Sequence, residues 1–214
     1  MSQIYTLNSH SESVIYLSKK DKRLAKVFSI VGEITYKPYS DNPFIFLIDT
    51  IVGQMLSNKV ADIICARVHE LCNNKVTPSK IKKLSTEALR SVGVSYSKAE
   101  YIHNLSAAVL SGDLNLKTLP KEEDEIVFKK LTSVRGIGNW SAKMYLIFVL
   151  NRQNILPFED MAFLQSYSWL YKTKDFKPSS VKNKCKKWEP YSSIAARYLY
   201  KALDLGYTKE PFSL

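Results

Sequence analysis

The segment that decides the fold is Leu131–Asp160, LTSVRGIGNWSAKMYLIFVLNRQNILPFED. It places Gly136 and Gly138 two residues apart between apolar segments, a pattern typical of a tight turn between two helices. Pro157 interrupts the helical spacing, and Asp160 directly precedes another apolar-rich segment. The segment therefore predicts a helical hairpin followed by a new helix. The apolar side chains that recur at helical spacing after the turn are Ala142, Tyr145, Leu146, Val149 and Leu150.

A glycine hairpin of this kind presents backbone N–H groups and a helix N-terminus to one side. That geometry binds a phosphate without a side chain and grips nucleic-acid backbone without reading its sequence. A plain pair of helices, whose glycines only permit positive φ, explains a short Gly-x-Gly motif equally well. The residues that follow the hairpin are needed to choose between these interpretations.

Those residues resemble a known family, the helix-hairpin-helix, Gly/Pro-rich, aspartate (HhH-GPD) superfamily of DNA glycosylases. Its 3-methyladenine DNA glycosylase II branch has the hairpin motif G-I-G-x-W-[ST]-A. The run from Trp188 to Leu199, W-x-P-Y-x-S-I-A-A-R-Y-L, resembles the closing helix of the family. The resemblance extends roughly from Ser18 to Leu205. The hairpin part of it rests on Leu131, Gly136-Ile137-Gly138, Trp140-Ser141-Ala142, Leu156-Pro157 and Asp160.

The resemblance implies an all-α, two-lobed fold with the active-site cleft between the lobes. One lobe, residues 36–154, would be a helical barrel that contains the hairpin. Residues 1–35 and 155–214 would form the second lobe. Larger members of the branch carry an extra N-terminal β-rich domain, for which 214 residues leave no room. Periodicity itself indicates only helices, with no convincing strand.

The family's chemistry is hydrolysis of the N-glycosidic bond that joins a damaged base to deoxyribose, here an alkylated purine such as 3-methyladenine or 7-methylguanine. The base must first be flipped out of the duplex. The resemblance assigns the catalytic carboxylate to Asp160, which would stabilise the oxocarbenium-like sugar. Asp160 also reads as the N-cap of the helix that follows it, and the two roles are compatible. The adjacent Glu159 would point in another direction.

Position 140 separates two subclasses of the family. Relatives that also cut the DNA backbone carry a lysine there, which attacks the sugar to form a Schiff base. Trp140 has no amine, so the resemblance implies a monofunctional glycosylase. Its indole would line the base pocket and attract a cationic purine, although an aromatic residue that only anchors the hairpin is the alternative. Met144 and Met161 stand where a better-known member has pocket tyrosines.

Two further groups of residues are expected to contact DNA. By position, Gln54 and Met55 look like the family's wedge, the side chain that fills the gap left by the flipped base, with Met55 preferred. Met55 is otherwise the last core position of its helix. The hairpin would hold the DNA backbone through Arg135, Gly136, Ile137, Gly138, Asn139 and Ser141.

No cofactor is expected, except a structural monovalent cation that the family's hairpins often hold, here through the backbone carbonyls of Thr132, Val134 and Ile137. The three cysteines and three histidines show no spacing typical of zinc ligands. Some relatives carry an iron–sulfur cluster on C-terminal cysteines. Only Cys185 lies in that region, so we expect none.

A formal charge of +11, from 31 Lys and Arg against 20 Asp and Glu, favours double-stranded DNA as the partner. No apolar run is long enough for a membrane span, and no signal peptide begins the chain, so an intracellular protein is expected, in the cytoplasm, nucleoid or nucleus according to the host. A monomer is expected, because one bound lesion needs only one copy of the protein. The alternatives are a non-catalytic DNA-binding module and a glycosylase for another lesion such as oxidised guanine.

Local signals predict the remaining elements. Residues 1–12 read as a loose tail and 18–31 as one basic helix. Asn42 and Pro43 begin a core helix, and Ser57 caps a second one with an apolar stripe at Val60, Ile63, Ile64, Val68 and Leu71. Ser97 and Glu100 form a capping box for a helix that ends at Gly112, and Pro120 opens the helix that leads into the hairpin with Ile126 inward. Residues 89–99 weakly repeat residues 131–142, which would give a second backbone contact.

Overall fold

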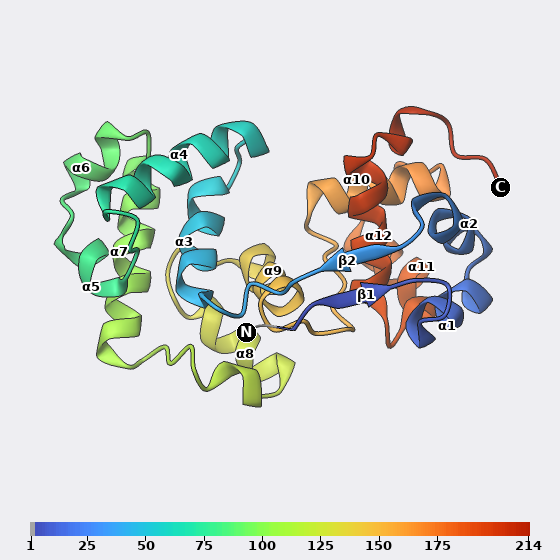
Figure 1. Ribbon diagram of the computed structural model, residues 1–214, viewed down its shortest axis with the longest axis horizontal. Helices are drawn as coiled ribbons and strands as arrows, with labels where there is room; N and C mark the ends of the chain where they lie inside the picture. Colours follow the sequence, from blue (N-terminus) through green and yellow to red (C-terminus); the bar gives the residue numbers. More distant parts are fainter. Residues whose placement is uncertain (1–2) are drawn as a thin grey trace. The chain divides into compact units, whose positions relative to one another are not determined.

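The computed structural model describes residues 3–214 as two compact units. The central unit comprises Tyr39–Leu150, and the terminal unit comprises the chain up to Pro38 together with Asn151–Leu214. Nearly all regular structure is helical, as expected (Figure 1). None of the helices within residues 3–214 combines the length and apolar content needed to cross a bilayer.

The central unit is built around α3, which packs against α4, α7 and α9 (Figure 1). As predicted, Asn42 caps α3, because its side-chain oxygen accepts a hydrogen bond from the Ile45 N–H. Gly112 ends α7 in the left-handed conformation, with φ of 88°. The elements of this unit are α3 (Pro43–Gly53), α4 (Asn58–Leu71), α5 (Pro78–Lys83), α6 (Thr86–Ser91), α7 (Tyr96–Ser111), the 3-10 turn η1 (Leu119–Lys121), α8 (Asp124–Thr132) and α9 (Asn139–Phe148).

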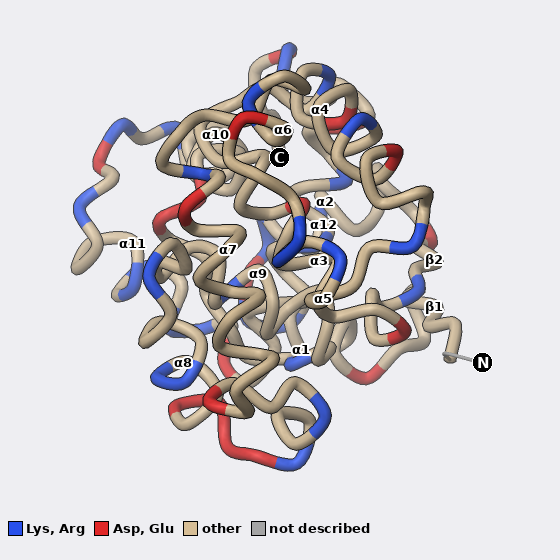
Figure 2. The backbone as a smooth tube through the Cα atoms, turned by 90° about the vertical axis from the view of Figure 1, so that its left-hand side faces the viewer, with Lys and Arg blue, Asp and Glu red and all other residues tan. Residues whose placement is uncertain are grey.

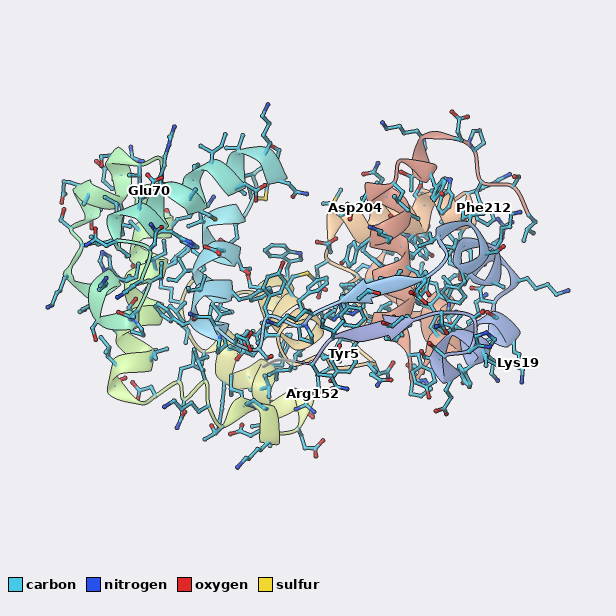
Figure 3. All side chains as sticks on the ribbon, in the orientation of Figure 1. Tyr5, Lys19, Glu70, Arg152, Asp204 and Phe212 are labelled. Carbon is cyan, nitrogen blue, oxygen red and sulfur yellow. The ribbon has the colours of Figure 1, made fainter. Side chains whose placement is uncertain are left out.

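In the terminal unit, α12 packs against α2 and α10. The C-terminal segment belongs to this unit and carries Phe212 (Figure 3), which is buried. The Phe212 ring meets the ring of Trp169 edge-on, with 4.9 Å between the ring centroids. Lysines recur along α11, where blue segments mark them (Figure 2). The elements are β1 (Tyr5–Leu7), α1 (Glu12–Lys20), α2 (Lys22–Val31), β2 (Ile34–Tyr36), α10 (Met161–Tyr171), α11 (Pro178–Cys185), η2 (Lys186–Trp188), α12 (Ser192–Asp204) and η3 (Tyr207–Lys209).

The N-terminal region differs most from the prediction. The expected tail instead contains strand β1, which pairs antiparallel with β2 in the register Tyr5 to Tyr36 (Figure 1). Each strand has three residues, too few for an alternating pattern to stand out in the sequence. The single helix predicted for residues 18–31 is wrong as well. Asp21, at φ of −144°, ends α1 and caps α2 by accepting hydrogen bonds from Arg23 and Leu24.

Two helix starts in the central unit were also predicted wrongly. The cap of α7 is Ser95, whose hydroxyl accepts a hydrogen bond from the Lys98 N–H, so the capping box from Ser97 is out of register by two residues. Pro120 lies in η1, and α8 begins only after Glu123. Of the three residues expected inward on this helix, Val127 and Leu131 are buried, but Ile126 is 46% exposed.

The apolar stripe predicted on α4 is only partly covered. Val60 and Ile63 are 43% and 44% exposed, whereas Val68 is fully buried. Ser57 precedes the helix but makes no side-chain capping bond. Periodicity identified the apolar face of α4, but whether another element covers that face depends on the tertiary fold.

Candidate nucleic-acid interface and catalytic aspartate

The glycine hairpin, residues 133–138 between α8 and α9, is the centre of the candidate interface. Gly136 has φ of 107°, a backbone conformation that residues other than glycine rarely adopt. A Cβ at this position would lie 2.3 Å from the Tyr101 Cβ on α7. Gly138, by contrast, has φ of −91° and serves as the N-cap of α9 without a side chain to cap it. A helix start of this kind suits an anion such as a phosphate.

The other predicted hairpin residues divide by exposure. Arg135 and Asn139 are exposed, and Arg135 forms an ion pair with Glu100 at 2.6 Å. Such an exposed pair contributes little stability, so a phosphate can compete for the guanidinium. Ile137 and Ser141 are buried and support the turn from within. Ser141 can therefore serve the interface only through its backbone.

The two glycines support a matched prediction. Gly136→Ala should lower the free energy of unfolding of the protein by about 2–5 kcal/mol, because backbone strain and the contact with Tyr101 add. Gly138→Ala should cost about 1 kcal/mol or less, since a Cβ added there would meet nothing within 4 Å. Urea unfolding of both variants measures the difference. Equal losses in the two variants would contradict this role for Gly136.

The loop Gln54–Ser57, here called the wedge loop, follows α3. Met55 is fully exposed and has φ of 59°, so it is not the last core position of its helix. The Gln54 side chain turns instead to the hairpin, where its amide donates hydrogen bonds to the Gly136 carbonyl at 3.0 Å and to the Ser141 hydroxyl at 3.3 Å. Of the two predicted residues, Met55 is thus the one exposed to solvent, and Gln54 joins its loop to the hairpin.

Asp160 lies in the terminal unit at the start of α10, and it is 9% exposed. One carboxylate oxygen accepts a hydrogen bond from the Phe163 N–H at 2.7 Å, which confirms the predicted N-cap. The turn that delivers it closes between the Asp160 N–H and the Pro157 carbonyl at 2.9 Å. A helix N-terminus favours a negative charge, so this position suits an acidic side chain.

Tyr200, on α12, is a neighbour of Asp160 that the sequence interpretation missed. Its hydroxyl faces the Asp160 carboxylate. Burial, together with the negative charge of Asp160, raises the pKa of Tyr200 well above its ordinary value. Arg197, one turn earlier on α12, stacks on the Tyr36 ring at 3.9 Å and donates to Asn151 at 3.3 Å. Tyr200 lies one residue beyond the closing-helix motif, so the motif did not single it out.

The predicted base-pocket residues come from both units. Trp140 and Met144 lie on α9 of the central unit, where Trp140 is half-buried and Met144 is buried. Met161, the first residue of α10, is 73% exposed. It lines a hollow of about 450 Å³ along α10 with Ala162, Leu164, Gln165, Ser168 and Phe176. Trp140 is therefore not a fully buried core aromatic.

Comparison with known proteins decides the family. Residues 48–190 match the HhH-GPD superfamily of base excision DNA repair proteins. The chain belongs to this superfamily. It is 29% identical over 212 residues to DNA-3-methyladenine glycosylase 1 of Schizosaccharomyces pombe, covering 95% of this chain and 92% of that protein. The match includes the hairpin, the wedge loop and Asp160, which confirms the resemblance inferred from the hairpin motif.

Solved structures agree with this assignment. The DNA-3-methyladenine glycosidase of Bacillus halodurans superimposes with a TM-score of 0.79 at 35% identity, covering 92% of each chain. The S. pombe 3-methyladenine DNA glycosylase in complex with abasic DNA superimposes with a TM-score of 0.83 at 26% identity, covering 95% of this chain and all of that one. Both confirm the helical glycosylase fold predicted from the sequence.

Proposed function

We propose that this protein is a monofunctional DNA glycosylase that releases alkylated purines, of the 3-methyladenine and 7-methylguanine type, in base excision repair. The observation that carries the proposal is Asp160, a buried carboxylate held at the N-terminus of α10 in a chain of the HhH-GPD superfamily. Relatives named DNA-3-methyladenine glycosylase match almost the whole chain, which supports this substrate class.

The reaction breaks the bond between the base nitrogen and C1′ of deoxyribose, and water supplies the new oxygen. As the bond breaks, the sugar gains oxocarbenium character, and the Asp160 carboxylate stabilises this positive charge and orients the attacking water. Alkylation at purine N3 or N7 makes the base cationic and a good leaving group. One carboxylate is therefore sufficient, without a strong general acid.

DNA binding is assigned to the hairpin and the wedge loop. The start of α9 takes a backbone phosphate, with Arg135 and Asn139 beside it, and this contact carries no sequence information. Met55 enters the duplex where the flipped base has left, since a flexible apolar side chain fills such a gap well. Trp140, Met144 and Met161 are each assigned to contact with the base, and the Trp140 indole attracts a cationic purine.

The remaining proposals concern ligands and context. The carbonyls of Thr132, Val134 and Ile137 are hard oxygen donors of the kind that suits a monovalent cation, and the Val134 carbonyl already accepts a hydrogen bond from the Ile137 N–H at 3.0 Å. A cation there would fix the turn that holds phosphate. The enzyme needs neither zinc nor an iron–sulfur cluster. It acts as a monomer in the compartment of the cell that contains the DNA.

The test is base release from methylated duplex DNA, with the strand checked for nicks. We expect free 3-methyladenine or 7-methylguanine and an abasic strand that stays uncut, because Trp140 supplies no amine for a Schiff base. A strand cut by the protein alone would contradict the monofunctional assignment. Base release only from a duplex that contains oxidised guanine would show that the substrate is an oxidised and not an alkylated purine. Binding that is indifferent to lesions, without release, would favour the non-catalytic module.

A further inference from the structure

The wedge loop holds Met55 in an unfavourable position. The side chain is fully exposed, and its backbone has φ of 59°, in the left-handed region. For a residue other than glycine, this conformation costs about 1–2 kcal/mol. Exposure of a large apolar side chain adds to the cost. Other contacts must therefore fix the loop in this shape.

Lys98, on the first turn of α7, provides two such contacts. Its ammonium group donates hydrogen bonds to the Val52 carbonyl at 2.8 Å and to the Gln54 carbonyl at 2.7 Å. These carbonyls belong to the end of α3, where helical acceptors lack N–H partners. Lys98 is half-buried, and burial lowers its pKa below the ordinary value. A charged donor at this distance forms a strong hydrogen bond.

The loop is fixed from a second side by the Gln54 amide, which donates to Gly136 and Ser141 in the hairpin. The main chain of Gln54 is thus held by α7, while its side chain is held by the hairpin. Met55 directly follows these two anchors and is left fully exposed. All of these contacts lie within the central unit.

We infer that Lys98 is a positioning residue for DNA repair, which holds the wedge loop so that Met55 is ready to enter the duplex. The inference rests on the proposed role of Met55 as the wedge. A wedge that is ordered before binding avoids the entropic cost of ordering it on DNA. The competing explanation is that Lys98 only joins α7 to α3 and stabilises the unit, with no effect specific to Met55.

A double-mutant cycle separates these explanations. The variants are Lys98→Met, Met55→Ala and the two combined. The readout is the ratio of affinities for a duplex with an abasic site and for the same intact duplex, because filling the gap requires the wedge but no chemistry. We expect Lys98→Met to lower this ratio about tenfold, as the loss of about 1.4 kcal/mol would do. In the Met55→Ala background, the same substitution should have no further effect.

Lys80 offers a matched control in the same unit. It is also half-buried, and its ammonium group donates to the Cys72 carbonyl at the end of α4, at 2.7 Å. Lys80→Met should leave the affinity ratio unchanged, even where it lowers the melting temperature. Lys98→Arg keeps donors and charge and should restore most of the ratio. Gln54→Leu, which removes the anchor to the hairpin, should lower the ratio and keeps the inference testable if Lys98→Met fails to fold.

The outcomes are distinct. If Lys98→Met lowers the affinity ratio equally in the wild type and in the Met55→Ala background, the inference is overturned, since Lys98 would then act only on stability. If Met55→Ala leaves the ratio unchanged, Met55 is not the wedge and the inference falls with it. Base release by the wild type is measured in parallel. It tests the proposed enzyme separately, because the affinity ratio requires no catalysis.

Discussion

Replacing Asp160 with asparagine is expected to lower the single-turnover rate of base release roughly 10²–10⁴-fold while leaving the fold intact. The amide has nearly the shape of the carboxylate, and its oxygen can still accept the hydrogen bond that caps α10 from Phe163. What the variant loses is the negative charge beside the sugar. The effect should therefore appear in the chemical step and not in stability or in affinity for the duplex.

Glu159→Gln is the matched control, because it removes a charge from the adjacent, half-buried carboxylate. Adjacent residues at a helix start point in different directions, so this variant should keep a rate within a few-fold of the wild type. Rates are measured with enzyme in excess on methylated duplex, and melting temperatures verify folding. A rapid Asp160→Asn enzyme, or a slow Glu159→Gln enzyme, would move the catalytic role away from Asp160.

The sequence was informative where local signals determine the structure. Two glycines with a following tryptophan and aspartate predicted the hairpin and its family, and Asn42 and Gly112 marked true helix ends. The helix ends depend on residues within a few positions of one another, and the family motif lies within the single segment Leu131–Asp160. The start of α10 at Asp160 was predicted for the same reason.

Contacts between distant segments could not be predicted in this way. Lys98 lies 46 residues from the Val52 carbonyl, so nothing near it in the sequence distinguishes it from the chain's other lysines. Tyr200 meets Asp160 only because α12 packs against α10. The exposed part of the apolar face of α4 could not be predicted either, because the spacing of apolar residues does not show whether another element covers them.

Asp21 is the strongest example of such a contact and supports the second prediction. From the sequence, Asp21 is only one charged residue within a predicted basic helix. In the structure it is 3% exposed, and it accepts hydrogen bonds from the Tyr171 hydroxyl and, at 3.0 Å, from the Trp188 indole N–H. Lys187 pairs with it at 3.0 Å. These partners lie up to 167 residues away and join the cap of α2 to the C-terminal part of the terminal unit.

Asp21→Ala should lower the free energy of unfolding by roughly 3–7 kcal/mol. The two donors, on half-buried Tyr171 and on buried Trp188, would each lose their acceptor at a cost of about 1–3 kcal/mol, and loss of the α2 cap adds about 1 kcal/mol. Glu125→Ala serves as the control, since the Glu125–Lys129 pair is exposed and contributes at most about 0.5 kcal/mol. Urea unfolding at pH 7 measures both. A loss below 1 kcal/mol for Asp21→Ala would contradict the network.

The same carboxylate predicts a dependence on pH. Burial alone would raise the pKa of Asp21, but the hydrogen bonds from Tyr171 and Trp188 and the charge of Lys187 outweigh it and lower the pKa. A folded pKa below the unfolded value of about 3.9 gives stability that is present above pH 3.9 and is lost as the pH falls through the folded pKa. Asp21→Asn cannot titrate there. Its stability deficit relative to the wild type should therefore shrink between pH 5 and pH 3, whereas a deficit that stays constant across this range would show that the charge of Asp21 contributes nothing.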